Sequence, residues 1–152
     1  MASRRNASRK IDAPVERVFK AVTDVNEFHK AAPHITHVEV LEGTTPGVGY
    51  KFRETRSMNG RESTTDLKIT EYKDNEYARF ITDQGGAVWD TLYTVSSSDA
   101  GTELSLEMEC RPHKFMAKMM TPLIMGMVGK AMETDMDAIK DYCEGRKITD
   151  AS

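Results

Sequence analysis

The sequence has no long hydrophobic run, few cysteines and no excess of positive charge, and each absence excludes a class of protein. No apolar stretch reaches the roughly 18 residues that suggest a membrane span. Lysine and arginine number 21 against 24 aspartates and glutamates in 152 residues, so the formal net charge is −3. Electrostatic binding of nucleic acid needs a concentrated basic surface, and we therefore expect no nucleic-acid partner.

The motifs of metal, cofactor and nucleophile sites are missing as well. The 2 cysteines, Cys110 and Cys143, belong to no CxxC or histidine-rich cluster, and we interpret them as reduced thiols of a cytoplasmic protein. His34 and His37 lack metal-site spacing, and no cluster of acidic residues joins them. The sequence contains no GxSxG, Walker or GxGxxG motif. We expect neither a metal nor another cofactor.

The N-terminal part of the sequence predicts one strand followed by two short helices. Residues 4–12 form a polar and weak strand pattern. Pro14 suits the first turn of a helix, and apolar residues at helical spacing follow in residues 15–22. Asp24 is a suitable cap for a second short helix that ends near Ala31. This order of elements is not a βαβ pattern.

Alternation with a period of two begins at Ile35 and continues to Cys110. Within it, Val48, Tyr50, Phe52 and Glu54 share one phase. Turn-forming residues divide the region into six strands, and the clearest of these signals are Asn59-Gly60, Lys73-Asp74-Asn75, Gln84-Gly85-Gly86 and Asp99-Ala100-Gly101. Six successive strands joined by short turns predict an antiparallel meander.

The last third of the sequence is helical in pattern and rich in methionine. Apolar residues recur at steps of three and four over residues 113–144, and the chain contains 10 methionines. Pro122 predicts a kink or a break near residues 121–122, with one continuous helix from there to Cys143. Gly145 is a plausible helix stop, and residues 145–152 are predicted to be a polar tail.

Four segments of the sequence resemble the START-like (SRPBCC) superfamily, in its polyketide cyclase/dehydrase-like branch. They are Ile11-Asp12-Ala13-Pro14-Val15-Glu16-Arg17-Val18-Phe19, Thr23-Asp24-Val25-Asn26-Glu27-Phe28, Pro46-Gly47-Val48-Gly49 and Gly101-Thr102-Glu103-Leu104. The resemblance covers residues 4–144, which we expect to form a single domain. It implies an α+β helix-grip fold, in which a seven-stranded curved antiparallel sheet wraps around the long C-terminal helix and leaves a cavity. Members of this superfamily use the cavity for lipids, sterols, polyketides, quinones or plant hormones, and some catalyse cyclisation or dehydration there.

The candidate ligand-binding residues are large or polar side chains at positions expected to face this cavity. Aromatic rings with polar tips suit a pocket that needs bulk and one or two hydrogen bonds, and methionines can repack around ligands of differing shape. Ordinary packing in the core is the alternative for both. The candidates are Phe28, Tyr50, Phe52, Glu54, Leu67, Ile69, Trp89, Thr91, Tyr93, Met108, Met116, Met120, Ile124 and Met127.

Three titratable residues are candidates for catalysis, namely Glu54, Arg79 and Tyr93. Glu54 has the same phase as Phe52, and burial would raise its pKa and suit it to acid or base work. The alternative is an exposed glutamate at a strand end, paired with a nearby arginine. An inward-facing Arg79 would anchor a carboxylate or an enolate, whereas a solvated charge at the sheet edge is the alternative.

The sequence therefore favours a protein that binds a small hydrophobic ligand, such as a lipid, a quinone or a polyketide-like molecule. No pair of titratable groups is clearly placed in one predicted wall, which favours binding over catalysis. Two alternatives stay open: a cyclase or dehydrase acting on an aromatic or polyketide-like substrate, and a chaperone-like domain that binds a protein partner. Both a monomer and a homodimer are compatible with the sequence.

Overall fold

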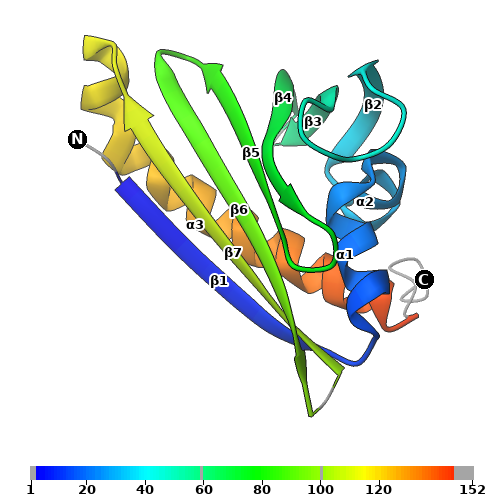
Figure 1. The fold of residues 1–152 in the computed structure, drawn as a ribbon. Helices are drawn as coiled ribbons and strands as arrows, with labels where there is room; N and C mark the ends of the chain where they lie inside the picture. The colour runs from blue at the N-terminus through cyan, green and yellow to red at the C-terminus, as the bar shows by residue number, and fades with distance from the viewer. Residues whose placement is uncertain (1–2, 59, 100, 146–152) are drawn as a thin grey trace.

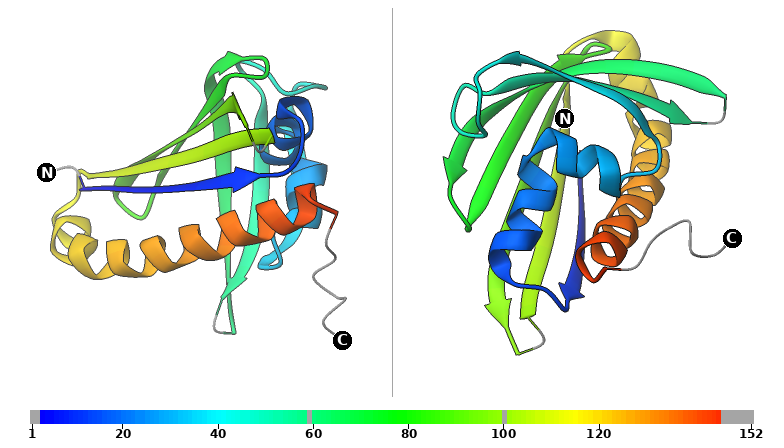
Figure 2. Two further views of the ribbon diagram at one scale, coloured as in Figure 1. Left: turned by 90° about the horizontal axis from the view of Figure 1, so that it is seen from below. Right: turned by 90° about the vertical axis from the view of Figure 1, so that its right-hand side faces the viewer.

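A computed structural model describes residues 3–58, 60–99 and 101–145, and this part of the chain forms one antiparallel sheet and three helices. The seven strands follow the order β1-β7-β6-β5-β4-β3-β2. The sheet curves over α3, and α1 and α2 lie at one end of it (Figures 1 and 2). In chain order, the elements are β1 (Ser3–Ile11), α1 (Val15–Thr23), α2 (Val25–Ala31), β2 (Ile35–Glu42), β3 (Lys51–Met58), β4 (Arg61–Lys73), β5 (Tyr77–Gln84), β6 (Ala87–Ser98), β7 (Gly101–Pro112) and α3 (Phe115–Cys143).

The meander predicted from the alternating pattern is confirmed, and β1 completes the sheet at its far edge. β1 pairs with β7 from Ser3 opposite Cys110 to Ile11 opposite Thr102. Gly101, with a φ of +123°, begins β7 so close to β1 that a Cβ on it would lie 2.6 Å from the carbonyl oxygen of Ile11. Only glycine fits this junction, since any side chain would collide with backbone atoms.

The two short helices are separated by a single capping residue, as the sequence predicts. The carboxylate of Asp24 accepts hydrogen bonds from the backbone N–H groups of Asn26 at 2.9 Å and Glu27 at 3.4 Å. Asp24 also ends α1, where its own N–H donates to the carbonyl of Lys20. Asp24 thus provides hydrogen-bond partners for a free carbonyl at the end of α1 and for free N–H groups at the start of α2. The chain can therefore turn sharply here, with both helices against the sheet.

The hydrophobic core lies between the concave face of the sheet, α1 and the C-terminal half of α3. Ile11, Ile69, Leu104, Met136 and Ile139 have no exposed surface. These side chains come from β1 at one sheet edge, from β4 and β7 within the sheet and from α3, and they belong to one cluster. The core therefore fills only the part of the space under the sheet that α1 closes.

β3 begins later than its pattern suggests. Val48 was expected to start the inward face of this strand, but it lies in the preceding loop and is 70% exposed. The loop persists because Gly49 has a φ of +92° and the N–H of Tyr50 donates to the carbonyl of Gly47 at 3.0 Å, which closes a turn. Asn59 and Ala100 of the predicted turns, and residues 146–152 of the predicted tail, lie outside the described residues.

A kink or a break was predicted near residues 121–122. The structure shows no break there, and α3 continues through Pro122. Proline has no N–H group, so Pro122 leaves the backbone carbonyl of Lys118 without its helical hydrogen bond. Both residues are exposed, and water can donate to this carbonyl instead. The first turns of the helix incline away from the rest (Figure 1). Gly145 follows the helix with a φ of +84°, as expected of a helix stop. No helix within the described residues is long and apolar enough to cross a membrane.

Candidate functional site

A cavity of about 450 Å³ lies between the concave face of the sheet and the middle of α3. Strands β3 to β7 form its sheet wall, and α1, α2 and α3 supply the remainder of the lining. Apolar atoms make up most of the lining surface. A space of this size and character is typical of a site for a small organic molecule.

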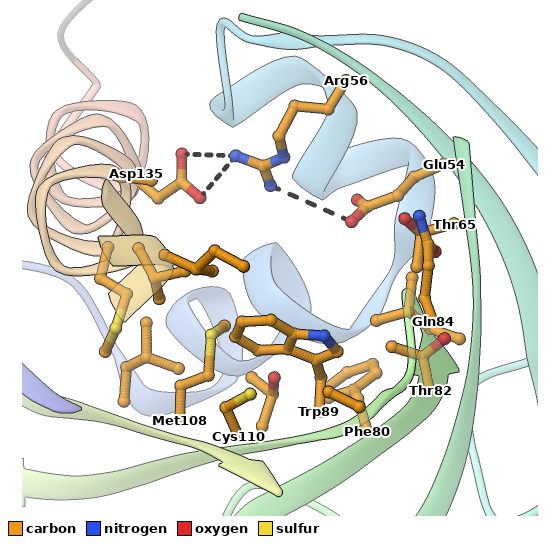
Figure 3. Close-up of a pocket in the computed structure, with 18 of the residues that line it drawn as sticks. Glu54, Arg56, Thr65, Phe80, Thr82, Gln84, Trp89, Met108, Cys110 and Asp135 are labelled. Carbon is orange, nitrogen blue, oxygen red and sulfur yellow. Dashed lines mark hydrogen bonds and ion pairs between the residues drawn. The ribbon is translucent and has the colours of Figure 1, made fainter. Parts of the chain in front are cut away.

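Aromatic and sulfur-containing side chains form one side of the cavity. Figure 3 shows Trp89, Phe80, Met108 and Cys110 side by side at the sheet surface. The ring of Phe80 makes edge-to-face contacts with Phe52 and Tyr93, and its centroid lies 5.9 Å and 6.0 Å from theirs. Such contacts fix the rings against one another, so this side is a preformed apolar surface.

A charged cluster of Glu54, Arg56 and Asp135 occupies the opposite side. Glu54 and Arg56 are two residues apart on β3 and therefore share a face, and Asp135 reaches them from α3. The Nη1 atom of Arg56 lies 3.0 Å and 3.3 Å from the two carboxylate oxygens of Asp135. Its Nη2 atom lies 4.0 Å from Oε1 of Glu54. The guanidinium thus stands between two carboxylates (Figure 3).

The environment of this cluster separates the roles of its two carboxyl groups. Burial raises the pKa of Glu54, the positive charge of Arg56 opposes this effect, and Asp135 adds to it. Burial lowers the pKa of Arg56, but the charges of Asp135 and Glu54 outweigh that effect and raise it overall. Arg56 remains a cation and is closely paired with Asp135 only. Glu54 is therefore the carboxyl group of the cluster that most readily takes up a proton.

Tyr93 adds a neutral hydroxyl to the same region. Its side chain is 7% exposed, and burial, together with the nearby charge of Asp135, raises the pKa of its phenol far above the ordinary value. The phenol stays protonated at any physiological pH. Tyr93 and the acid form of Glu54 can both donate a hydrogen bond to an acceptor oxygen in the cavity.

Uncharged polar side chains continue this polar side toward the β5–β6 turn. Thr65 of β4 and Thr82 and Gln84 of β5 lie beside Glu54 (Figure 3), and Gly85 of the turn also lines the cavity. Their hydroxyl and amide groups can both donate and accept hydrogen bonds. The cavity thus has an apolar side and a polar side.

Most of the candidate ligand-binding residues do line the cavity. They come from α2, β3, β4, β6, β7 and α3, and their side chains converge although they are distant in sequence. Tyr50 and Ile69, by contrast, are buried in the core and do not reach the cavity. The predicted residues in the lining are Phe28, Phe52, Glu54, Leu67, Trp89, Thr91, Tyr93, Met108 and Ile124.

The three methionines of α3 that were predicted to line the cavity face solvent instead. Met116, Met120 and Met127 are 67%, 42% and 53% exposed. The inward side of this part of α3 is a neighbouring stripe of mostly smaller residues, Ala117, Thr121, Ile124 and Val128. Apolar residues occupy several sides of the helix here, so their spacing alone did not identify the side that faces the sheet.

Arg79 was a catalytic candidate on the condition that it points inward, and it lies on the opposite face of the sheet. Its Nη1 atom is 2.7 Å from a carboxylate oxygen of Asp90, and its Nε atom is 3.1 Å from Glu71. On β5 the inward side chains are Phe80 and Thr82, which alternate with Arg79 and Ile81. The alternative was a solvated charge at the sheet edge. Arg79 does point away from the cavity, but it lies on the central strand and is paired with two carboxylates.

Sequence reasoning did not include Arg56 and Asp135 among the site residues. Arg56 follows Glu54 in the same strand phase, so alternation alone predicts that the two face one side. Asp135 lies among buried Met132, Met136 and Ile139 on α3, and a single acid within an apolar stripe indicates a buried partner.

The thiols of Cys110 and Cys143 are free and buried. No group of three or more His, Cys, Asp or Glu side chains within the described residues is arranged to hold a metal ion.

Comparison with known proteins identifies both a sequence family and a set of similar structures. Residues 4–144 match the family described as polyketide cyclase/dehydrase and lipid transport. The Zhui aromatase/cyclase from a Streptomyces species has a TM-score of 0.79 at 16% identity, covering 95% of this chain and 94% of that chain. A protein from Thermus thermophilus gives 0.75 at 17% identity, covering 91% and 95%. Ara h 8.0201 gives 0.75 at 18% identity, covering 94% and 98%. No curated protein sequence matches the chain.

Proposed function

Because this chain belongs to the polyketide cyclase/dehydrase and lipid transport family, we propose that its cavity binds a small hydrophobic molecule that carries carbonyl or hydroxyl oxygens. A quinone, a polyketide-like compound or a lipid of similar size has this chemistry. The observation that carries the proposal is that a cavity of about 450 Å³ has one apolar side and one polar side. Apolar surface provides affinity, and a few fixed polar groups orient the ligand.

The charges at the polar side favour a neutral ligand over an anionic one. Asp135 already neutralises Arg56 at 3.0 Å, and Glu54 adds either a second negative charge or a protonated carboxyl group. The cluster therefore offers no net positive charge to a carboxylate or phosphate. Tyr93 and protonated Glu54 offer O–H donors, which suit a carbonyl oxygen.

Calorimetry with 1,4-naphthoquinone and anthraquinone at two temperatures tests the proposal directly. We expect saturable heat and a negative heat-capacity change, which marks the burial of apolar surface. Trp89 is the only tryptophan of the chain and lines the cavity, so its emission should be quenched in the same titration. The binding proposal is wrong if heat and emission both remain unchanged across quinones, aromatic polyketides and lipids.

A pair of matched variants locates the binding site. Tyr93→Phe removes one buried hydroxyl and keeps the ring, and we expect it to weaken quinone binding about 3- to 10-fold, the value of one hydrogen bond. Tyr77→Phe makes the same chemical change on β5, at a position outside the cavity lining. This control should bind as the unmodified protein does. Equal affinities for both variants would place the ligand elsewhere.

A second candidate function, a cyclase or dehydrase acting on an aromatic or polyketide-like substrate, is favoured by Glu54. Its raised pKa suits a general acid that protonates a carbonyl or a leaving hydroxyl. Incubation with a short aromatic β-polyketone, followed by chromatography, tests this activity. An enzyme should form a product that Glu54→Gln abolishes, and its rate should fall as the pH rises through the pKa of Glu54. Product formation no faster than in buffer would leave binding as the function.

Three further expectations accompany the proposal. We propose that residues 4–144 act as one domain, the span that the family match covers. A cytoplasmic location is supported by the free, buried state of Cys110 and Cys143, since secreted proteins of this size commonly form disulfides. We propose either a monomer or a homodimer.

A further inference from the structure

The N-terminal half of α3 exposes a large apolar surface to solvent. Large hydrophobic side chains on the outer side of the helix are 42–73% exposed, and they lie within four turns. The patch consists of Phe115, Met116, Met119, Met120, Leu123 and Met127, and we call it the α3 apolar face. Soluble proteins expose single large hydrophobic residues commonly, but contiguous patches of this kind mark an interaction surface.

The charged side chains of the chain segment that carries this face are all positive. Between Arg111 and Glu133 the sequence contains no acidic residue, although the chain as a whole has a net charge of −3. Lys114, Lys118 and Lys130 are exposed in this stretch. None of these lysines forms an ion pair within residues 3–58, 60–99 and 101–145.

Neighbouring elements add a further basic group, and the nearest acids are already paired. The exposed side chain of Arg5, on β1, lies 3.7 Å from the position that a Cβ on Gly129 would occupy. Asp83 contacts His113 at 2.9 Å, and Glu109 and Asp90 contact Arg111. The surface therefore combines an apolar centre with unpaired positive charges at its edges.

We propose that the α3 apolar face docks onto the surface of an anionic phospholipid bilayer. A helix that lies in the membrane interface buries large apolar side chains at the boundary of headgroups and acyl chains, while lysines contact the phosphates. The α3 apolar face provides both groups in one surface. Docking through this face does not depend on the ligand proposed for the cavity.

A second copy of the chain fits the same surface less well. If two α3 apolar faces packed against each other in antiparallel fashion, Lys114 and Lys118 of one copy would approach Lys130 of the other. No acidic residue in this stretch is available to compensate these charges. Anionic headgroups, by contrast, neutralise every one of them.

Docking would also place the cavity next to the membrane. The opposite side of the same helical turns carries Ala117, Thr121 and Ile124, which line the cavity. An α-helix with its side chains is about 10 Å thick, so the bilayer surface and the cavity would be separated by little more than this helix.

Flotation of the whole protein with lipid vesicles tests the proposal. We expect binding to vesicles of equal parts phosphatidylcholine and phosphatidylglycerol to exceed binding to phosphatidylcholine alone by at least about tenfold, and to weaken in about 0.5 M salt. Leu123→Glu places a negative charge at the centre of the α3 apolar face and should reduce this binding at least about tenfold. Val48→Glu is the matched control, because Val48 is 70% and Leu123 63% exposed. It should bind vesicles as the unmodified protein does.

Two results would overturn the proposal. The first is equal binding of Leu123→Glu and Val48→Glu to the anionic vesicles, with both variants unchanged in their thermal melts. The second is a dimer in size-exclusion chromatography that Leu123→Glu converts to a monomer, together with no vesicle binding by the unmodified protein. In that case the face is an interface between copies of this chain. Failure of quinone binding would not affect either measurement.

Discussion

The two halves of α3 differ in the side of the helix that carries their apolar residues. In the C-terminal half, Met132, Met136 and Ile139 are buried against the sheet, and the outer side is charged and ion-paired: Glu133 and Asp137 contact Arg9 at 2.5 Å and 2.8 Å. In the N-terminal half, most of the large apolar side chains point outward, and the inward side carries Met125 together with mostly smaller residues. One half anchors the helix, and the other leaves the cavity open beneath it.

This difference follows from the volume of the inward side chains. Met136 and Ile139 fill the space between the helix and the sheet, whereas Ala117 and Thr121 fill much less of it. The free energy of folding should therefore come mainly from the C-terminal half, and binding should use the N-terminal half. Each of the following variants tests one part of this division.

The largest expected effect is the removal of an anchoring side chain. Ile139→Ala should lower the free energy of unfolding by about 2–5 kcal/mol, because Ile139 is fully buried and its loss leaves a void in the core. Leu123→Ala, in the α3 apolar face, should change it by less than about 0.5 kcal/mol. Urea melts of both variants give the comparison, and similar losses would contradict the division of α3.

The next effect concerns the ion pair between Arg56 and Asp135, which lies in the C-terminal half of α3 and borders the cavity. Arg56→Leu leaves the buried carboxylate of Asp135 without its partner, so it should lower the free energy of unfolding by about 3 kcal/mol. This is the lower end of the range for breaking a buried ion pair, because the Arg56 side chain is 21% exposed. The double variant Arg56→Leu with Asp135→Leu should recover most of that loss. Denaturation of the two variants measures it, and a double variant less stable than the single one would refute this account.

A smaller effect is expected at Ile124, on the cavity side of the N-terminal half. Ile124 is half-buried and borders open space, so Ile124→Ala should cost less than about 2 kcal/mol, below the range for a closely packed core. Calorimetry should also show that this variant binds 1,4-naphthoquinone more weakly than the unmodified protein does. A loss equal to that of Ile139→Ala would show that the cavity wall is as well packed as the core.

The smallest effect is a dependence of stability on pH. Since the pKa of Glu54 is raised above its ordinary value of 4.5, the folded protein binds its proton more tightly than the unfolded chain does. Stability should therefore fall as the pH rises from about 4.5 through the pKa of the folded state, and should then remain constant. Glu54→Gln removes this slope. Melts of both proteins from about pH 5 to pH 8 isolate it, and a stability of the unmodified protein that rose relative to the variant would give the wrong sign.

The elements of the fold were predictable because their signals are local. The cap at Asp24, the turns and the period of two along β6 each depend on a few neighbouring residues. The same alternation placed Trp89, Thr91 and Tyr93 on the cavity side of β6, with Asp90 and Leu92 on the other face.

Local signals failed where both sides of an element are apolar. On β5, Ala78 and Phe80 face inward while Ile81 stands beside Arg79 on the other face, so alternation could not set the phase. The N-terminal half of α3 has the same ambiguity. The pairing of Arg56 with Asp135 joins residues 79 positions apart, and only the folded chain determines it.

The pairing of β1 with β7 has a consequence for how this chain folds. Ile11 meets Thr102 and Ser3 meets Cys110, so the first strand has no partner until about a hundred further residues have been synthesised. α3, which closes the core against β1, follows later still. Contacts this distant in sequence slow the search for the native state, because a long loop must close before any of them form. We therefore expect β1 to stay unpaired during synthesis until β7 has emerged, and the core to close only after α3 has followed.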